Sequence, residues 1–213
     1  MFRLRYKLNP KSKTHPLLKS KYPLTSIMPI SRIIFLLFFP ACIAILLKQV
    51  IWGLDLTHQL LAIGIFFFCI EQANMANQDL QKVADAKNRI KDSRLDEFQT
   101  TTITTIVIEL IGFYLSSIWL SFGLIFILIG IIWFNLFVKI KLKKTASDII
   151  IQPWLRTERL TVLIADIIGL ILASLWILDV GDFWISWGLF SMAVIYCCIK
   201  LFLFFQSFVF TAN

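Results

Sequence analysis

The sequence predicts an all-α fold: a polytopic α-helical membrane protein with about six transmembrane helices and a polar helix projecting between the second and the third. Composition is the first reason, because 58% of the 213 residues are hydrophobic and only 16% are charged, and apolar runs of membrane-spanning length recur. The second reason is the stretch from Glu71 to Gln99, the one long water-compatible segment between two apolar halves. Any chemistry in water is therefore expected there or in the N-terminal segment.

The first 29 residues form a basic arm. They contain seven Lys or Arg residues, no acidic residue and four prolines, and the prolines prevent a continuous helix. We expect this arm to lie in the cytoplasm and to contact the anionic leaflet; an organellar transit peptide is the alternative. Residues 30–213 then form a second domain, the six-helix transmembrane domain.

Six apolar runs predict the spans. The first is expected to kink at Pro40. The second is short, so it either crosses fully, which we favour, or forms a shallow hairpin with the first. Residues 71–99 are predicted to form the cytoplasmic helix, because apolar residues recur three or four apart without Pro or Gly, and residues 139–159 to form an interfacial loop. The expected spans are 30–54, 56–70, 101–119, 122–138, 160–178 and 183–205.

Charge sets the expected orientation. With six spans, one side of the membrane collects the arm, the polar helix and the 139–159 loop, and the other side holds only Lys48 among all Lys and Arg residues. Both termini are therefore placed in the cytoplasm, or in the stroma, and the membrane is a bacterial plasma membrane or a thylakoid. Five tryptophans are expected near the opposite interface: Trp52, Trp119, Trp176, Trp184 and Trp187.

Besides Arg32 and Lys48 near the ends of the first span, three charged residues fall inside predicted spans: Glu109, Asp166 and Lys200. A charge in hydrocarbon is costly, so each is a candidate site residue. One interpretation is structural: Asp166 and Lys200 form a buried pair that locks the last two spans. Glu109 then bonds a neighbouring helix through Thr104, Thr105, Ser116 or Asn135. The alternatives are proton or ion translocation through the two carboxylates, and binding of a partner subunit or a lipid head group.

Two apolar patterns predict contact surfaces. One is a stripe on the polar helix formed by Leu80, Val83, Ala86 and Ile90, expected to pack on another domain or another protein. The other is a row of small residues on the fifth span, Ala165, Gly169 and Ala173, which would let another helix approach closely. The expected partners are the lipid bilayer and other membrane protein subunits. The charges of the polar helix nearly cancel, which argues against nucleic acid.

The polar stretch also carries the pattern NQxxxxxxDxxNR, made by Asn77, Gln78, Asp85, Asn88 and Arg89. It resembles the first motif of UbiA-type intramembrane prenyltransferases, in which paired Asp residues hold magnesium and a prenyl diphosphate. The resemblance covers 13 residues and implies diphosphate and metal roles for Asn77, Asp85 and Asn88. The chain departs from the motif where the first Asp falls on Gln81 and the Pro on Ile90, and no second Asp-rich motif follows.

Other catalytic patterns are missing from the sequence, including a glycine-rich phosphate loop and His-Glu-x-x-His. No cofactor and no metal are predicted, and the four cysteines, Cys42, Cys69, Cys197 and Cys198, are expected to be packed or lipid-facing thiols. A non-catalytic role is favoured over an enzyme: an accessory, assembly or scaffold component of a larger membrane complex. The alternatives are a small transporter or ion pathway using Glu109 and Asp166, and a degenerate UbiA-type protein.

Overall fold

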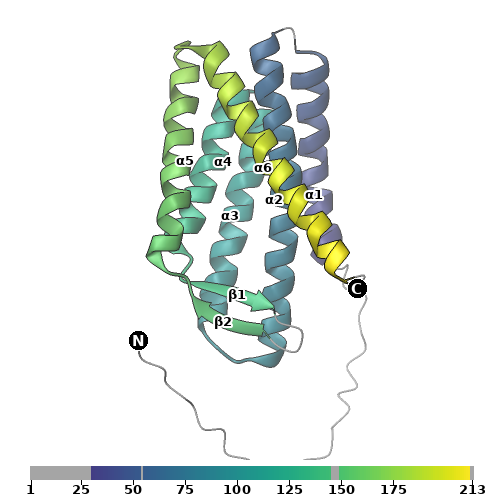
Figure 1. The fold of residues 1–213 in the computed structure, drawn as a ribbon, viewed down its shortest axis with the longest axis vertical. Coiled ribbons are helices and arrows are strands. Elements are labelled where there is room, and N and C mark those ends of the chain that lie inside the picture. Colours follow the sequence, from purple (N-terminus) through teal and green to yellow (C-terminus); the bar gives the residue numbers. More distant parts are fainter. Residues whose placement is uncertain (1–29, 54, 145–148, 212–213) are drawn as a thin grey trace, which may run out of the picture.

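The computed structural model describes the backbone of residues 30–53, 55–144 and 149–211. The basic arm predicted for residues 1–29 lies outside these described residues. In the described part the chain forms six helices and one two-stranded sheet (Figure 1). The helices are α1 (Ile30–Ile45), continued by the π-helix η1 (Leu46–Ile51), α2 (Leu56–Arg89), α3 (Arg94–Ser116), α4 (Leu120–Phe137), α5 (Arg156–Ile177) and α6 (Asp182–Thr211). The strands are β1 (Ile140–Lys144) and β2 (Ile149–Pro153).

Five of these helices are long and apolar enough to cross a membrane: α1 with η1, α2, α3, α4 and α5. The predicted multi-span helical architecture is therefore confirmed in its coarse form. The backbone of α6 runs for 30 residues, but the apolar section whose side chains are described covers only Asp182–Ile195. The sixth crossing thus stays a prediction.

The two ends of the helical bundle differ. The β-hairpin of β1 and β2 lies at one end, which we call the hairpin end (Figure 1). The turns after η1, α3 and α5 form the opposite end, which we call the tryptophan end because Trp52, Trp119 and Trp184 are exposed there. Trp176 also lies at this end but is buried.

The sequence predicted that the polar stretch forms one projecting helix. It instead forms two helix ends joined by a turn. α2 is a single helix of 34 residues, about 51 Å long at 1.5 Å per residue. It exceeds a hydrocarbon core of about 30 Å, so its polar half lies beyond the apolar zone. α2 ends at Arg89, Ile90 is extended, and α3 begins at Arg94. No Pro or Gly marks this reversal; the Asp92 side chain accepts a hydrogen bond from the Arg94 amide at 2.9 Å and shapes the turn.

The 139–159 segment, predicted to be an interfacial loop, contains the two paired strands β1 and β2 and then the first residues of α5. β1 and β2 are antiparallel, with Ile140 opposite Pro153 and Leu142 opposite Ile151. Residues directly opposite each other share one face of the pair, so Ile140, Leu142, Ile151 and Pro153 lie on the same side, whereas Ile150 lies on the other side and is exposed. The Trp154 amide donates to the Lys139 carbonyl at 2.9 Å and continues the pairing beyond β2.

That apolar face covers the ends of α2 and α3 and builds a second hydrophobic core, which we call the hairpin-end core. Its buried members are Val83, Ala86, Leu95, Phe98, Val138 and Ile140. Val83 is 1% exposed and Ala86 is 0% exposed, while Leu80 packs against the main core between the spans. The stripe was predicted to pack on another domain or another protein; its centre is covered by this chain's own hairpin and α3, and Ile90 is half-buried.

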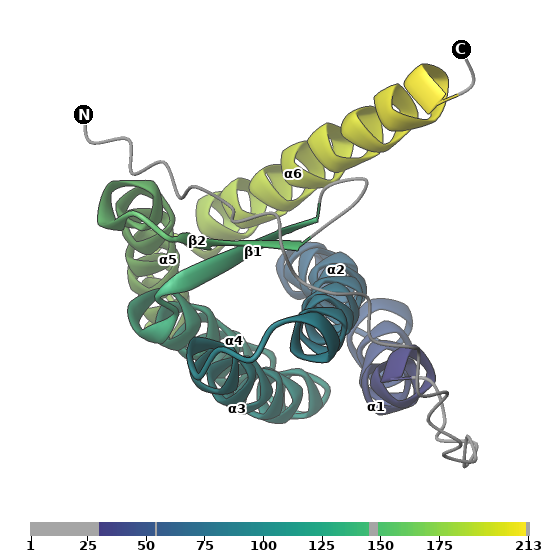
Figure 2. The same cartoon turned by 90° about the horizontal axis from the view of Figure 1, so that it is seen from below.

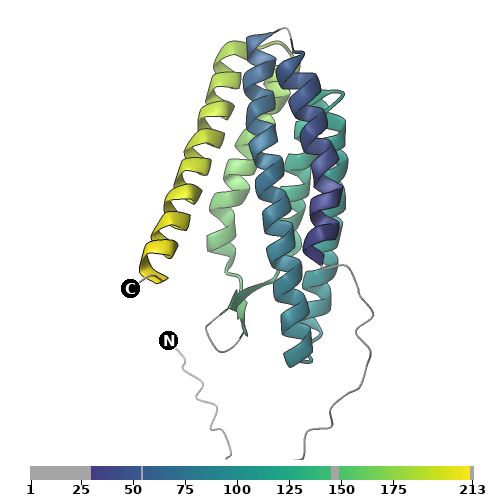
Figure 3. The same cartoon turned by 90° about the vertical axis from the view of Figure 1, so that its right-hand side faces the viewer.

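The last two helices do not form the tight antiparallel pair predicted. α6 packs mainly against α2 and contacts α5 much less. Figure 2 shows α6 leaving the bundle at an angle as it approaches the hairpin end, and Figure 3 shows the same divergence from the side. The α2 contact is close at Gly64, where an added Cβ would lie 3.6 Å from the Ala193 Cβ.

α3 and α4 make the most extensive helix contact in the described chain, and three glycines permit it. A Cβ added at Gly112 of α3 would lie 2.7 Å from Ile127 Cγ1, and one added at Gly130 of α4 would lie 3.0 Å from Glu109 Cγ. A Cβ at Gly123 would collide with the backbone nitrogen and the Oγ of Ser116. Small residues at such crossings are typical of packing between membrane helices.

We predict that Gly123→Ala strongly destabilises the folded protein, because the collision involves the α3 backbone and no side-chain rotation relieves it. The matched control is Gly188→Ala on α6, since a Cβ added at Gly188 meets nothing within 4 Å. Thermal unfolding in detergent, followed by intrinsic tryptophan fluorescence, measures both. Equal unfolding temperatures for the two variants would contradict the α3–α4 packing.

Candidate functional site

A row of polar side chains lies on the buried face of α3. Thr102, Thr105, Glu109 and Ser116 are buried, and their spacings of three, four and seven residues place them on one side of the helix. The three hydroxyls donate to carbonyls four residues earlier: Thr102 to Phe98 at 2.8 Å, Thr105 to Thr101 at 2.9 Å and Ser116 to Gly112 at 2.9 Å. The hydroxyl protons are thus satisfied within α3.

Glu109 is 3% exposed in the middle of this row. Its side chain packs on Gly130, where the lack of a Cβ leaves room for it, and it lies close enough to Cys69 of α2 to act on it electrostatically. The sequence predicted that Thr104, Thr105, Ser116 or Asn135 would bond Glu109. Thr105 and Ser116 instead donate within α3, and Asn135 donates elsewhere.

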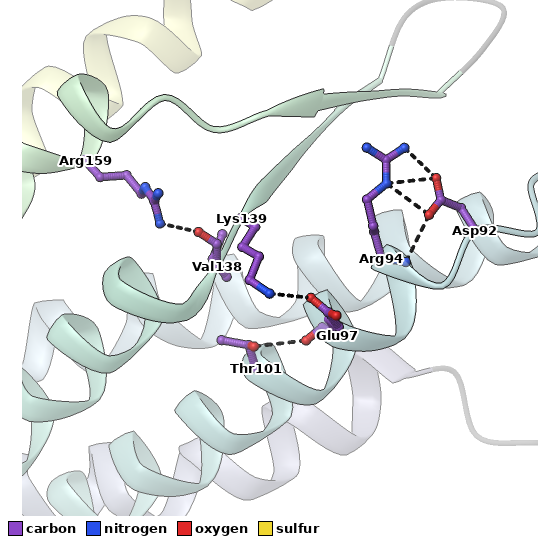
Figure 4. A network of polar contacts seen from close by, with 7 residues as sticks. All are labelled: Asp92, Arg94, Glu97, Thr101, Val138, Lys139 and Arg159. Atoms are coloured by element: carbon purple, nitrogen blue, oxygen red, sulfur yellow. Dashed lines mark hydrogen bonds and ion pairs between the residues drawn. The ribbon is translucent and has the colours of Figure 1, made fainter.

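The Asn135 side chain links α4 to α5. Its Nδ2 donates to the Ile131 carbonyl at 3.0 Å and to Asp166 Oδ2 at 3.5 Å. Arg159, two turns before Asp166 on α5, donates through Nη1 to the Asn135 carbonyl at 3.1 Å and to the Val138 carbonyl (Figure 4). These carbonyls end α4, where a cation is favourable. A polar connection therefore runs from the hairpin end along the α4–α5 contact to Asp166.

The small residues predicted on the fifth span are divided between two environments. Gly169 and Ala173 are buried, and Gly169 faces Leu128 of α4, whose Cδ2 would lie 3.5 Å from an added Cβ. Ala165 is exposed. Gly169 therefore serves the α4–α5 contact inside this chain, and a contact of Ala165 with a partner stays a prediction. Lys200, predicted to pair with Asp166, has a side chain outside the described residues.

Ion pairs fasten the hairpin to the helix ends. Lys139 pairs with Glu97 at 3.0 Å (Figure 4), and Lys141 pairs with Glu158 at 2.6 Å. Lys87 at the end of α2 also pairs with Asp96 at the start of α3. These side chains are mostly exposed, so each pair contributes little to stability by itself. They fix the relative positions of α2, α3 and the hairpin above the hairpin-end core.

The turn between α2 and α3 is held by Asp92 and Arg94. The Arg94 guanidinium donates to both carboxylate oxygens of Asp92, with the shortest distance, 2.6 Å, between Nη2 and Oδ2 (Figure 4). These bonds, together with the bond from the Arg94 amide, hold the pKa of Asp92 below its usual range. The carboxylate form therefore stabilises the turn.

The three residues highlighted by the UbiA-type pattern all lie on α2 and have different surroundings. The Asn77 Oδ1 accepts a hydrogen bond from Gln81 at 2.9 Å, Asp85 is partly buried and has its own interaction, and Asn88 is exposed. Among the residues that the structure describes, no group of three or more His, Cys, Asp or Glu side chains could hold a metal ion. A magnesium diphosphate site needs such converging oxygen ligands.

One juxtaposition was missed by the sequence reasoning. Cys42 on α1 and Cys69 on α2 belong to one buried cluster, and the Cys69 Sγ lies 3.9 Å from the carbonyl oxygen of Phe38, one turn before Cys42. Both are buried, at 7% and 0% exposure. The two residues are 27 positions apart in separate apolar runs, and no spacing rule relates cysteines on neighbouring spans, so only the α1–α2 packing reveals the pair.

No family description, curated protein or solved structure matches this chain. The class of the protein therefore rests on its own architecture. Five helices have the length and composition to cross a membrane, and large apolar side chains are exposed along all of them, as expected of helices in contact with a lipid bilayer. The chain is a multi-span helical membrane protein.

We predict that Asp92→Ala loosens the turn between α2 and α3, because it removes the acceptor for both the Arg94 amide and the guanidinium. Hydrogen exchange of the amides of residues 90–98, referred to their intrinsic rates, is expected to speed up. Asp92→Asn, which keeps an acceptor but no charge, is expected to have a smaller effect.

The same turn gives a pH dependence. A carboxylate with a lowered pKa contributes stability that is present at neutral pH and is lost as the pH falls through that lowered pKa. Protection of this turn in the wild type is therefore expected to fall in strongly acidic buffer, whereas Asp92→Ala loses no further protection there. A wild-type turn whose protection does not change on acidification would contradict the role of Asp92.

Proposed function

We propose that this chain is a non-catalytic component of a larger membrane complex, and that a transmembrane helix of a partner subunit docks on α5 beside Asp166. One observation supports the proposal: the carboxyl of Asp166 is partly buried within α5, the candidate span that this chain's own residues cover least. The orientation predicted from the sequence is retained in the proposal, with the hairpin end facing the cytoplasm or the stroma. Lys48 is the one Lys or Arg near the tryptophan end in the described part of the chain, where Asp55, Asp179 and Asp182 also lie.

α5 is poorly covered by its own chain. Only 11% of its spanning segment is buried, against 28–44% in the other four candidate spans. It contacts α4 along one face and α6 much less. Its outward face presents Ile164, Ile167, Ile168 and Ile171, each about half exposed. Of the five candidate spans in the described residues, α5 therefore leaves the largest share of its residues to lipid or to another subunit.

Asp166 makes lipid alone an unsuitable cover for that face. The hydrogen bond that the structure describes for Asp166 comes from Asn135 at 3.5 Å, whereas a carboxylate has about four acceptor sites. Asp166 lies seven residues, roughly 10 Å, beyond Arg159 along α5, and Arg159 binds the end of α4. At that depth acyl chains offer no donors, and an unpaired carboxylate costs several kcal/mol.

A helix from another subunit can supply the missing donor. A Lys or Arg side chain would complement the charge, and an Asn, Gln or Ser side chain would donate a hydrogen bond. The small neighbour Ala165, exposed beside Asp166, lets such a helix approach closely. We therefore expect the partner to be a transmembrane helix. It carries a polar side chain that donates a hydrogen bond about 10 Å into the membrane from the residues at the interface.

Site-specific crosslinking tests this proposal in native membranes. A photoreactive phenylalanine analogue at Ile167 is expected to crosslink one partner protein, and the same probe at Val107, an exposed position on α3, is not. Asp166→Leu is expected to lower the Ile167 crosslink at least about tenfold, because a hydrogen bond to a charged group contributes about 1.5–3 kcal/mol. The matched control is Ser174→Ala, since the exposed Ser174 hydroxyl only donates to the Leu170 carbonyl of its own helix.

Two outcomes would contradict the proposal. The first is an Ile167 probe that reacts only with lipid in the wild type. The second is that Lys200 of the same chain satisfies Asp166. In that case Lys200→Met and Asp166→Leu lower the unfolding temperature of the purified monomer equally, and any crosslink at Ile167 persists in both variants.

The buried polar row on α3 favours a second candidate function, a proton pathway through Glu109. Thr102, Thr105 and Glu109 follow one another at single-turn spacing from the hairpin end, and Asn135 and Asp166 lie on the other side of α4. Each threonine hydroxyl keeps lone pairs free to accept while its proton is bonded within the helix. Such a row provides polar stepping points to a carboxyl in the interior.

If this second function is present, Glu109→Gln abolishes proton flux while the protein stays folded, because glutamine keeps the shape of the side chain but carries no exchangeable acid. Proteoliposomes loaded with a pH-sensitive dye measure the flux after a pH step, and thermal unfolding checks the fold. The control is Thr104→Val, a position beside the row rather than in it. Equal flux for wild-type, Glu109→Gln and empty liposomes would exclude the pathway.

A further inference from the structure

Two thiols from different helices meet in the interior of the bundle. Cys42 lies on α1 and Cys69 on α2, and both belong to the same buried cluster. The Cys69 Sγ lies 3.9 Å from the carbonyl oxygen of Phe38, which is one turn before Cys42. This contact places Cys69 against the turn of α1 that leads to Cys42. Both cysteines are free thiols in this structure.

The surroundings of the pair are apolar and closely packed. Phe38, Ala41 and Ile65 are each at most 5% exposed and belong to the same buried cluster as the two cysteines. Cys42 is 12 residues from the first residue of α1, and Cys69 is 13 residues from the first residue of α2, so both lie roughly 18–20 Å from those helix ends. The thiols are therefore at membrane depth, away from reductants and oxidants dissolved in water.

We propose that Cys42 and Cys69 are a redox-responsive pair that closes to a disulfide joining α1 to α2. Two S–H bonds break and one S–S bond forms, and the two electrons and two protons pass to a lipid-soluble quinone, which becomes a quinol. A quinone is the class of oxidant that reaches this depth, because it dissolves in the hydrocarbon. The product carries no charge, so it adds no buried charge to the apolar interior.

A soft metal ion is a poorer occupant of the pair. Two thiolates holding one monovalent cation keep a net negative charge, and Glu109 lies close enough to Cys69 to act on it electrostatically. Moving an uncompensated charge into an interior of low dielectric constant is costly. The neutral disulfide avoids that cost. The inference does not depend on the partner proposed for α5, because it concerns other helices.

Thiol counting in native membranes tests the pair. Membranes holding the full chain are treated with a short-chain quinone, denatured, alkylated with N-ethylmaleimide and analysed by peptide mass spectrometry. Of the four cysteines, Cys197 and Cys198 are expected to be alkylated, whereas the peptides that contain Cys42 and Cys69 are expected to be joined by a disulfide. Reduction before alkylation is expected to restore four alkylated cysteines.

Matched variants decide the outcome. Cys198→Ser, which removes an exposed thiol, is expected to leave the Cys42–Cys69 disulfide unchanged, and Cys42→Ser is expected to abolish it and leave Cys69 alkylated. Iodine serves as a second oxidant that also enters the bilayer. The proposal is overturned if Cys42 and Cys69 remain fully alkylated after both oxidants, or if Cys69 joins a cysteine other than Cys42. Retention of silver by the reduced pair with no disulfide under either oxidant also overturns it.

Discussion

The close approach of α3 and α4 is the contact on which the rest of this structure depends. Glycines at the crossing let the two helices approach within a distance that a single added carbon would prevent. The same contact encloses Glu109 against Gly130 and turns Asn135, on the opposite side of α4, toward α5. Every intramembrane polar contact described between α4 and α5 therefore presupposes the glycine-lined crossing.

The helices α2 and α3 end in a small hydrophobic core that lies outside the apolar zone. α2 and α3 continue past the spans, and the β-hairpin closes over Val83 and Ala86. Ion pairs between exposed residues are too weak to hold that arrangement alone, so the apolar contacts of the hairpin-end core stabilise it. The chain itself buries the apolar face of the polar stretch. We therefore expect partners to bind α5, whose outward side remains uncovered.

The sequence was sufficient for the membrane class, the approximate spans and the carboxyls that the interior makes costly, because these follow from hydropathy and from the price of burying charge. The sequence did not predict the turn after Arg89, because the Asp92 side chain shapes that turn and the turn contains neither Pro nor Gly. It also failed for partners across helices: Asn135 lies opposite Asp166 and Cys42 meets Cys69 only because of how the helices pack. Small residues at Gly112, Gly123 and Gly130 were a readable signal that the sequence analysis overlooked in favour of the stripe on the fifth span.

The structure holds α5 less firmly than the other helices, which we call the tight group. α1, α2, α3 and α4 supply most of the main core and α6 packs against α2, whereas α5 adds Ala173 and Trp176 to that core and otherwise relies on one face of α4 and on polar bonds from Arg159 and Asn135. Polar bonds of this kind set the register of a helix, but cover little of its surface. A helix held in register yet left uncovered is suited to receive another helix without rearrangement of the core. The covalent link proposed for Cys42 and Cys69 would act within the tight group, so docking at α5 and oxidation of the thiols can vary independently.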